Sequence, residues 1–200
     1  MDDKAFRQFL ERVPADVLVV SDEAYYEYVK ADDYPETIPL LQQYKNLIVL
    51  RTFSKAYGLA ALRVGYGVTN ETLAQQLDPV RPPFNNTTFA HIAAQAALND
   101  QAFIDECVEN NTNALKQFEE FCDEHQLRFY PTETNFILID FKRSGDELFD
   151  ELLKQGYIVR SGEALGYPTC VRISMGTEEE NRLLLEALRK LLATEAVARS

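Results

Sequence analysis

Cysteine, histidine and positive charge are all scarce in this sequence of 200 residues. The three cysteines are an odd number without the spacing of a metal site, and the two histidines lie far apart in the chain. We therefore expect reduced thiols, no bound metal and a cytoplasmic location. The net charge of −12 argues against nucleic acid or an anionic membrane as a partner. It does not exclude a small anionic substrate, because a pocket can be locally positive.

Long apolar runs are missing too. No run approaches the roughly 20 residues that a membrane-spanning helix needs. The N-terminus, Met1-Asp-Asp-Lys, lacks the basic and then apolar layout of a signal peptide. What the sequence does contain is 46% apolar and 26% charged residues, which is typical of one or two soluble globular domains.

Helical and strand-like patterns alternate in the first part of the chain. This alternation predicts a layered α/β sheet with parallel strand pairing. The expected helices cover residues 2–12, 39–44 and 70–77, and the expected strands cover residues 17–20, 47–50 and 64–68. Pro79, Pro82 and Pro83 then interrupt regular structure, so we place a domain boundary between residues 85 and 86.

The rest of the chain predicts a small α+β unit. It begins with helices at residues 88–98 and 101–126, the second of which is long and carries an apolar stripe. Strands are expected at residues 127–130, 135–140, 157–160 and 170–174, with a helix at residues 145–155. Thr177 and Glu180 have the spacing of a capping box and should begin the final helix.

One stretch concentrates residues that could carry chemistry. It runs Leu50-Arg-Thr-Phe-Ser-Lys-Ala-Tyr-Gly58 and continues to Arg63, after a short apolar strand. A lysine in this place could react with a carbonyl group, and the neighbouring hydroxyls and arginine could hold a dianion such as a phosphate. Pyridoxal phosphate presents both an aldehyde and a phosphate. Asp22 follows the preceding strand, a common place for ligand contacts in open α/β sheets.

Five segments resemble the fold-type I pyridoxal-phosphate aminotransferases, most closely the histidinol-phosphate aminotransferases. They stand in the family's order and at about its spacing, over essentially the whole chain. The segments are Val20-Ser-Asp-Glu-Ala-Tyr25, Arg51-Thr-Phe-Ser-Lys-Ala-Tyr-Gly58 with Arg63, Arg81-Pro-Pro-Phe-Asn85, Thr134-Asn-Phe136 and Val171-Arg-Ile-Ser-Met-Gly-Thr177. The resemblance implies the C-terminal part of the family's α/β fold. Residues 1–85 would be a partial large domain with a mostly parallel sheet, and residues 86–200 a linking long helix and an α+β small domain.

The resemblance also implies a role for each candidate residue at the cofactor, pyridoxal 5'-phosphate. Lys55 would bind it covalently as an aldimine and then move the substrate proton. Asp22 would pair with the pyridine nitrogen and Tyr25 with the 3-oxygen of the ring. The phosphate would be held by Thr52, Ser54 and Arg63.

Three further residues would bind the substrate, a small anionic amino-acid-like molecule. Arg172 would pair with its carboxylate or the group in that place, Asn135 would lie nearby, and Arg160 would meet a distal phosphate. The implied reaction transfers an amino group between L-histidinol phosphate and 2-oxoglutarate in histidine biosynthesis, in a homodimeric enzyme.

The residues by themselves leave other interpretations open. Asp22 could cap a helix, Lys55 could be a solvated surface lysine, and Tyr25 could serve only in packing. Arg172 could point to solvent. Arg160 could form a surface salt bridge.

The family's chains are longer at the N-terminus. We expect this chain to lack the phosphate-binding turn, the aromatic residue that stacks on the pyridine ring, the asparagine beside the 3-oxygen and the tyrosine lent to the neighbouring site. It should then fall short of full turnover. The alternatives are a non-catalytic folded fragment that serves as an association module, a sibling aromatic aminotransferase, or a threonine-phosphate decarboxylase.

Overall fold

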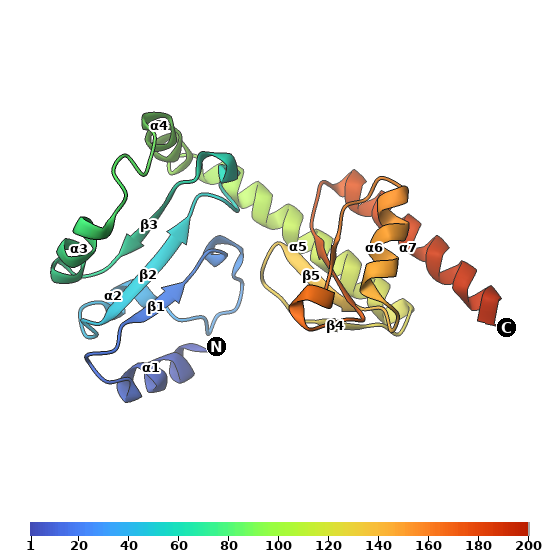
Figure 1. Ribbon diagram of the computed structural model, residues 1–200, viewed down its shortest axis with the longest axis horizontal. Coiled ribbons are helices and arrows are strands. Elements are labelled where there is room, and N and C mark those ends of the chain that lie inside the picture. The colour runs from blue at the N-terminus through green and yellow to red at the C-terminus, as the bar shows by residue number, and fades with distance from the viewer. Residues whose placement is uncertain (200) are drawn as a thin grey trace. The chain divides into compact units, whose positions relative to one another are not determined.

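A computed structural model describes residues 1–199 of the chain, and the side chains of residues 1–194; Ser200 lies outside the described residues. The chain divides into two compact units, residues 1–105 and residues 106–200. The division falls inside helix α5 (Gln101–Glu124), and the predicted boundary between residues 85 and 86 falls inside the first unit. Figure 1 shows the helices and strands of both units, which are described separately.

Unit 1 holds a sheet in which the described strands follow the order β1-β2-β3. Their bounds are Val19–Asp22 for β1, Leu47–Thr52 for β2 and Gly65–Val68 for β3. Strands β1 and β2 run parallel, which confirms the pairing predicted from the alternating pattern. Strand β3 runs antiparallel to β2, so the prediction of a mostly parallel sheet is wrong for this pair. Residues 53–64 form turns and a short 3-10 turn, and they contain no α-helix of the kind that usually crosses over between parallel strands.

Helices α1 (Asp3–Arg12) and α2 (Thr37–Leu40) cover one face of this sheet. The side chains of a strand alternate between the two faces of the sheet, so every second strand residue points toward these helices. Val19, Leu47 and Val49 share a buried cluster with Phe6 and Leu10 of α1 and Leu40 of α2. The helices of unit 1 are α1 (Asp3–Arg12), α2 (Thr37–Leu40), α3 (Glu71–Leu77) and α4 (Thr88–Ala97), with 3-10 turns η1 (Tyr26–Tyr28), η2 (Ala60–Leu62) and η3 (Asp78–Val80).

The opposite face of the same sheet is more open. Val20 is 51% exposed and Leu50 is 37% exposed, although both are strand residues with apolar side chains. The strand register sets Asp22 beside Leu50, and Leu50 beside Gly67 of β3. The open face therefore carries a carboxylate at the end of β1 and a glycine where β3 would otherwise present a side chain.

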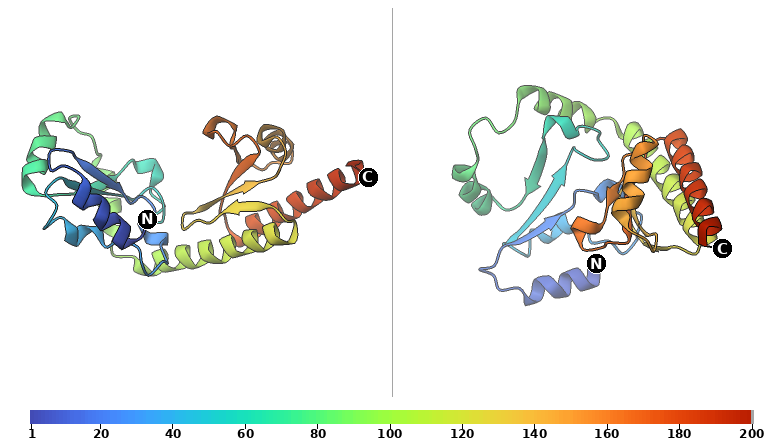
Figure 2. Two further views of the ribbon diagram at one scale, coloured as in Figure 1. Left: turned by 90° about the horizontal axis from the view of Figure 1, so that it is seen from below. Right: turned by 45° about the vertical axis from the view of Figure 1, so that its right-hand side comes forward.

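Unit 2 holds a second sheet, whose described strands follow the order β4-β5-β7-β6 with antiparallel pairing throughout. The strands are β4 (Arg128–Tyr130), β5 (Phe136–Asp140), β6 (Arg160–Ser161) and β7 (Cys170–Ser174). The chain also forms α6 (Gly145–Lys154), the 3-10 turn η4 (Glu163–Leu165) and α7 (Glu178–Arg199). Helices α5 and α7 lie along one face of this sheet (Figure 2).

The core of unit 2 joins that face of the sheet to its helices. Phe118 and Phe121 of α5 are fully buried. The cluster is completed by Ile137 and Ile139 of β5, Val171 and Ile173 of β7, Leu148 and Leu152 of α6, and Leu184, Leu185 and Leu188 of α7. These strands and helices form the predicted α+β arrangement.

Two predicted strands differ from the structure. The strand expected at residues 17–20 lies instead at residues 19–22, because the Val17 amide donates to the carbonyl of Pro14 and closes a turn. The strand expected at residues 157–160 is reduced to Arg160 and Ser161. Ile158 is 84% exposed, so its apolar side chain did not mark a buried strand.

The predicted start of the last helix is confirmed. The Thr177 amide donates to Glu180 Oε2 at 2.8 Å, and the Glu180 amide donates to Thr177 Oγ1 at 3.3 Å, as in a capping box. Among the described residues, none of the helices is both long and apolar enough to cross a membrane. In the same part of the chain, histidine, cysteine and carboxylate side chains form no group that could hold a metal ion.

Phe118 should be a major source of stability for unit 2. Replacing it with alanine leaves a cavity in a fully buried cluster, and we expect Phe118→Ala to lower the free energy of unfolding by about 3–5 kcal/mol. Urea unfolding followed by circular dichroism measures this change. Leu153→Ala, at a side chain 45% exposed on α6, is the control and should cost much less. Equal losses for the two variants would contradict the described core.

The thiols should differ in reactivity. All three cysteines are free, but Cys122 is fully buried, and burial, helped by the charges of Asp123 and Glu119, raises its pKa to about 12. Only the thiolate reacts readily, so raising the pH from about 7 to about 9 should speed alkylation of the partly exposed Cys107 while Cys122 stays protected. Mass spectrometry of alkylated peptides measures both rates. Denatured chain, in which the two rates converge, is the control, and rapid native labelling of Cys122 would refute the expectation.

Candidate functional site

A pocket of about 560 Å³ opens on unit 1 beside the carboxyl ends of β1 and β2. The register of the sheet sets Asp22 of β1 beside Leu50, and Thr52 beside Gly65. Both pairs lie on the open face of the sheet. The pocket is lined by Asp22, Ala24, Leu50, Arg51, Thr52, Ser54, Lys55, Arg63, Gly65, Tyr66 and Gly67. Five of the residues predicted to bind the cofactor thus line one pocket, namely Asp22, Thr52, Ser54, Lys55 and Arg63.

Lys55 stands in a turn that is closed by backbone hydrogen bonds. The Gly58 amide donates to the carbonyl of Lys55 at 2.9 Å, and Gly58 has φ of +69°, a conformation that favours glycine. Just before the turn, buried Phe53 donates its amide to the carbonyl of Val64 at 3.1 Å. The lysine is half-buried, so it is not the fully solvated surface residue that the sequence also allowed.

The hydroxyl residues before Lys55 are ordered by the same turn. Thr52 Oγ1 accepts from the Ser54 amide at 3.0 Å. Arg63, which follows η2, is a non-glycine residue in the left-handed region with φ of 54°, and its Nη1 donates to the carbonyl of Ala60 at 2.8 Å. Such a backbone conformation costs on the order of 1 kcal/mol or more and persists only where neighbouring structure fixes it. Here the turn places Arg63 in the lining of the same pocket as Thr52 and Ser54.

Asp22, at the end of β1, lines the pocket, whereas Tyr25, in the turn that follows, is not among the lining residues and faces Lys55. Asp22 is exposed and its Oδ1 accepts from the Ala24 amide at 3.2 Å, a local turn contact rather than the cap of an α-helix. The Tyr25 ring centre lies 5.1 Å from Lys55 Nζ, within the range of a cation–π interaction. Tyr25 therefore contacts the lysine through its ring. It also packs near Tyr28, with the two ring centres 6.5 Å apart.

A largely buried ion pair joins the pocket-lining Arg51 to Glu23, and the sequence patterns did not predict it. Glu23 is 2% exposed, and its Oε2 accepts from Arg51 Nη2 at 2.7 Å and from Arg51 Nε at 2.9 Å. Burial lowers the pKa of the Arg51 guanidinium, but the hydrogen bond and charge of Glu23 outweigh burial and raise the pKa above its ordinary value. The available signal was strand alternation, since Arg51 falls on the same face as Leu47 and Val49.

Unit 2 carries the three residues predicted to bind substrate. Arg160 of β6 and Arg172 of β7 are directly paired in the register of the sheet, so their side chains leave the same face. The Arg172 guanidinium carbon lies 4.9 Å from the centre of the Phe136 ring, and its Nε is buried without a hydrogen-bond partner among the described residues. A buried guanidinium nitrogen without an acceptor is costly, which favours an anionic ligand there.

Arg160 and Asn135 complete this group at lower burial. Arg160 is exposed, and among the described residues it takes part in no ion pair, so the alternative of a surface salt bridge is not seen. Asn135 is half-buried, and its carbonyl accepts from the Met175 amide at 2.9 Å, which holds it beside the end of β7. Unit 2 thus gathers two arginines and an amide near one strand pair.

Residues 1–188 match the model of the family described as aminotransferase class I and II. The chain belongs to this family. It is 63% identical over 185 residues to a histidinol-phosphate aminotransferase of Bacillus licheniformis and 61% identical over 184 residues to that of Bacillus subtilis. Each alignment covers 92% of this chain and 51% of the relative, so the chain spans about half the length of the curated relatives it matches. The resemblance to histidinol-phosphate aminotransferases, over their C-terminal part, is confirmed.

Solved structures agree with this relationship. A histidinol-phosphate aminotransferase of Sinorhizobium meliloti, in complex with pyridoxal-5'-phosphate, matches with a TM-score of 0.83 and 32% identity. That match covers 96% of this chain and 54% of the other. The histidinol-phosphate aminotransferase of Clostridium acetobutylicum matches with a TM-score of 0.87 and 25% identity, over 96% and 59% of the two chains. The predicted α/β fold of the fold-type I aminotransferases is therefore confirmed over roughly half the length of those structures.

Gly65 should be required for the shape of the pocket. A Cβ built at Gly65 would lie 2.8 Å from the carbonyl oxygen of Arg51, which is backbone and cannot move aside cheaply. We expect Gly65→Ala to separate β3 from β2 and to cost about 1–3 kcal/mol, the usual range for overpacking. Calorimetric unfolding measures the loss. Gly67→Ala is the matched control, since the nearest neighbour of its Cβ would be the movable Leu50 side chain at 3.3 Å. A similar loss in both variants would show that the contact at Gly65 is not decisive.

Proposed function

We propose that this chain forms the lysine-bearing part of a pyridoxal-phosphate-dependent aminotransferase that acts on histidinol phosphate. The observation that carries the proposal is the pocket of unit 1, which sets a lysine amine beside an arginine, two hydroxyls and a carboxylate. Identity of about 60% to histidinol-phosphate aminotransferases supports the choice of substrate. The amino acceptor would be 2-oxoglutarate.

The residues of the pocket suit the chemistry of pyridoxal phosphate. The cofactor, when bound, supplies an aldehyde for an amine and a protonated ring that withdraws electrons from the reacting carbon. Lys55 would bind it covalently and move a proton at the substrate carbon. Asp22 would keep the ring nitrogen protonated, and Tyr25 would hold the 3-oxygen.

The hydroxyls of Thr52 and Ser54 and the guanidinium of Arg63 would hold the cofactor phosphate. Hydroxyl and guanidinium donors are the groups that bind phosphate oxygens best. Gly65 and Gly67 line the pocket without side chains, and at Gly65 the carbonyl oxygen of Arg51 leaves no room for a Cβ.

For unit 2, we propose that Arg172 pairs with an anionic group of the substrate. Its buried and unpartnered Nε supports this role, because an oxyanion would satisfy it. Arg160, its register partner, would add charge for a phosphate, and Asn135 would donate an amide hydrogen bond. Residues 1–85 would correspond to part of the large domain of the family, and residues 86–200 to the linking helix and small domain. The homodimer and the cytoplasmic location stay predictions.

Covalent trapping tests the proposed function. The chain is mixed with pyridoxal phosphate, reduced with borohydride and digested, and the modified residue is identified by mass spectrometry. We expect a visible absorbance band before reduction and a single major adduct on Lys55. Lys55→Ala should remove both, and Lys4→Ala, on α1 outside the pocket, should change neither.

The amino donor is tested in the same system. Histidinol phosphate should discharge the absorbance band of the loaded chain, whereas a phosphothreonine or an aromatic amino acid should do so far more slowly. Absence of any adduct on Lys55 would refute the cofactor site and favour a non-catalytic association module. Preference for phosphothreonine or an aromatic amino acid would overturn the assigned substrate.

A further inference from the structure

The Glu23–Arg51 ion pair adjoins the candidate site: Glu23 is buried outside the lining of the pocket, whereas Arg51 is one of the lining residues. Glu23 follows Asp22, and its amide continues the strand ladder by donating to the carbonyl of Leu50 at 2.9 Å. Arg51 precedes Thr52 in β2. Because successive side chains of a strand point to opposite faces, each member of the pair adjoins a residue that lines the pocket.

Glu23 and Arg51 are charged, whereas the neighbouring buried cluster is apolar, so filling space in the core does not explain the pair. Val19, Leu47 and Val49 occupy the same face, and an apolar pair in place of Glu23 and Arg51 would extend their cluster. Buried ion pairs contribute little net stability, because desolvating two charges offsets their attraction. They do impose a defined geometry. Geometry, rather than stability, is therefore what this pair can contribute.

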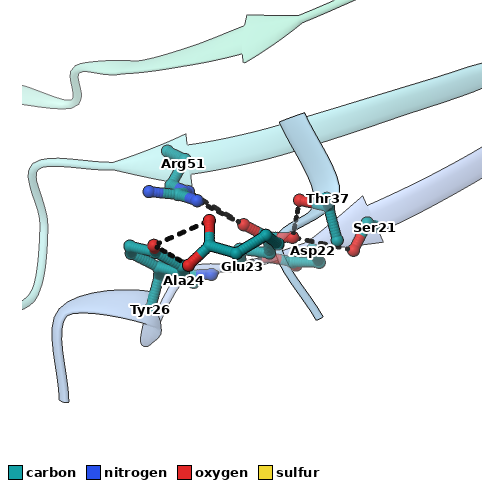
Figure 3. A network of polar contacts seen from close by, with 8 residues as sticks. Ser21, Asp22, Glu23, Ala24, Tyr26, Thr37 and Arg51 are labelled. Carbon is teal, nitrogen blue, oxygen red and sulfur yellow. Dashed lines mark hydrogen bonds and ion pairs between the residues drawn. The ribbon is translucent and has the colours of Figure 1, made fainter. Parts of the chain in front are cut away.

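Both oxygens of the Glu23 carboxylate accept hydrogen bonds. Oε2 accepts from Arg51, and Oε1 accepts from Thr37 Oγ1 of α2 and from Ser21 Oγ at 3.2 Å. Figure 3 shows Ser21, Thr37 and Arg51 converging on this carboxylate. One side chain thus connects β1, β2 and α2.

Arg51 makes a second connection to the same segment. Its guanidinium carbon lies 3.3 Å from the centre of the Tyr26 ring, and the Tyr26 hydroxyl donates to Glu36 Oε1 at 3.2 Å (Figure 3). Residues 22–26 are therefore attached to β2 at Glu23 and again at Tyr26. Asp22, which lines the pocket, and Tyr25, which faces Lys55, both belong to this attached segment.

We propose that Glu23 and Arg51 are positioning residues that hold Asp22 and Tyr25 in place relative to Lys55 for binding of the cofactor. The proposal rests on the proposed function. Glu23 does not line the pocket, so it would act without touching the cofactor, whereas Arg51 also belongs to the lining. Sliding residues 22–26 along β2 would carry the carboxylate of Asp22 and the phenol of Tyr25 away from Lys55, while the pocket residues of β2 and of the lysine turn stay in place.

The test separates position from stability by removing the whole buried polar group. The triple variant Glu23→Leu, Thr37→Val and Arg51→Met replaces charges and hydroxyl by apolar side chains of similar size, so it should fold with about wild-type stability. We expect it to bind pyridoxal phosphate at least tenfold more weakly and to be trapped by borohydride on Lys55 more slowly. Because Arg51 lines the pocket, the single variant Glu23→Gln, which leaves every lining residue unchanged, is the decisive partner. It should weaken binding as well, with a loss of stability from the unpaired arginine, and unchanged binding in Glu23→Gln would show that the triple variant acts only through the lost Arg51 guanidinium.

A destabilised control isolates the effect. Val49→Ala removes apolar contacts beneath the same strand, so it should lower stability while changing cofactor affinity by less than about twofold, because the polar connections remain. Wild-type affinity in the stable triple variant, or an equal loss of affinity in Val49→Ala, would overturn the proposal.

A measurement on the cofactor-free chain tests the positioning role even if the proposed function is refuted. Amide hydrogen exchange of residues 22–26 in the free chain should be at least tenfold faster in the triple variant than in wild type at equal global stability. Unchanged exchange would overturn the positioning role by itself. Failure of the wild-type chain to take up pyridoxal phosphate would instead refute the cofactor site, and the exchange result would still apply to the ion pair.

Discussion

The side chains of strand β2 alternate between the two faces of its sheet, and the organisation of unit 1 depends on that alternation. Leu47 and Val49 pack against the helices, whereas Leu50 and Thr52 line the pocket. Parallel pairing with β1 brings the carboxyl ends of both strands to the same edge of the sheet. Carboxylate, hydroxyls and lysine, which come from segments separated in sequence, meet at that edge as a result. This is the edge at which open α/β sheets commonly bind ligands.

The pocket residues could be found from the sequence because they stand close to apolar runs that mark strands. The runs before Asp22 and Lys55 predicted two parallel strands, and the turn after β2 predicted a place for a reactive amine. Chemistry then restricted the interpretation, since a lysine beside hydroxyls and arginine suits an aldehyde that carries a phosphate. Spacing along the chain was sufficient for residues that share one edge of one sheet.

Other features were missed because they depend on contacts between distant residues. Glu23 and Arg51 are charged types that are usually exposed, so their burial beside Val19 and Val49 was not expected. The antiparallel pairing of β3 depends on a turn whose direction the apolar pattern does not encode. At Ile158 the prediction was wrong in the opposite direction. An apolar residue predicted to belong to a strand has an exposed side chain. The pairing of Arg160 with Arg172 likewise requires the register of a sheet.

The adjacent carboxylates Asp22 and Glu23 show how narrowly the length of this segment is constrained. One lines a pocket at the surface, and the other is buried against an arginine, although they are chemically similar and follow each other in the chain. Because the side-chain period of a strand is two, removing or inserting a single residue before them would exchange their faces. A substitution can therefore change the chemistry of this segment without moving it, whereas an insertion or deletion would keep both faces only if it fell in the loops beyond the strand.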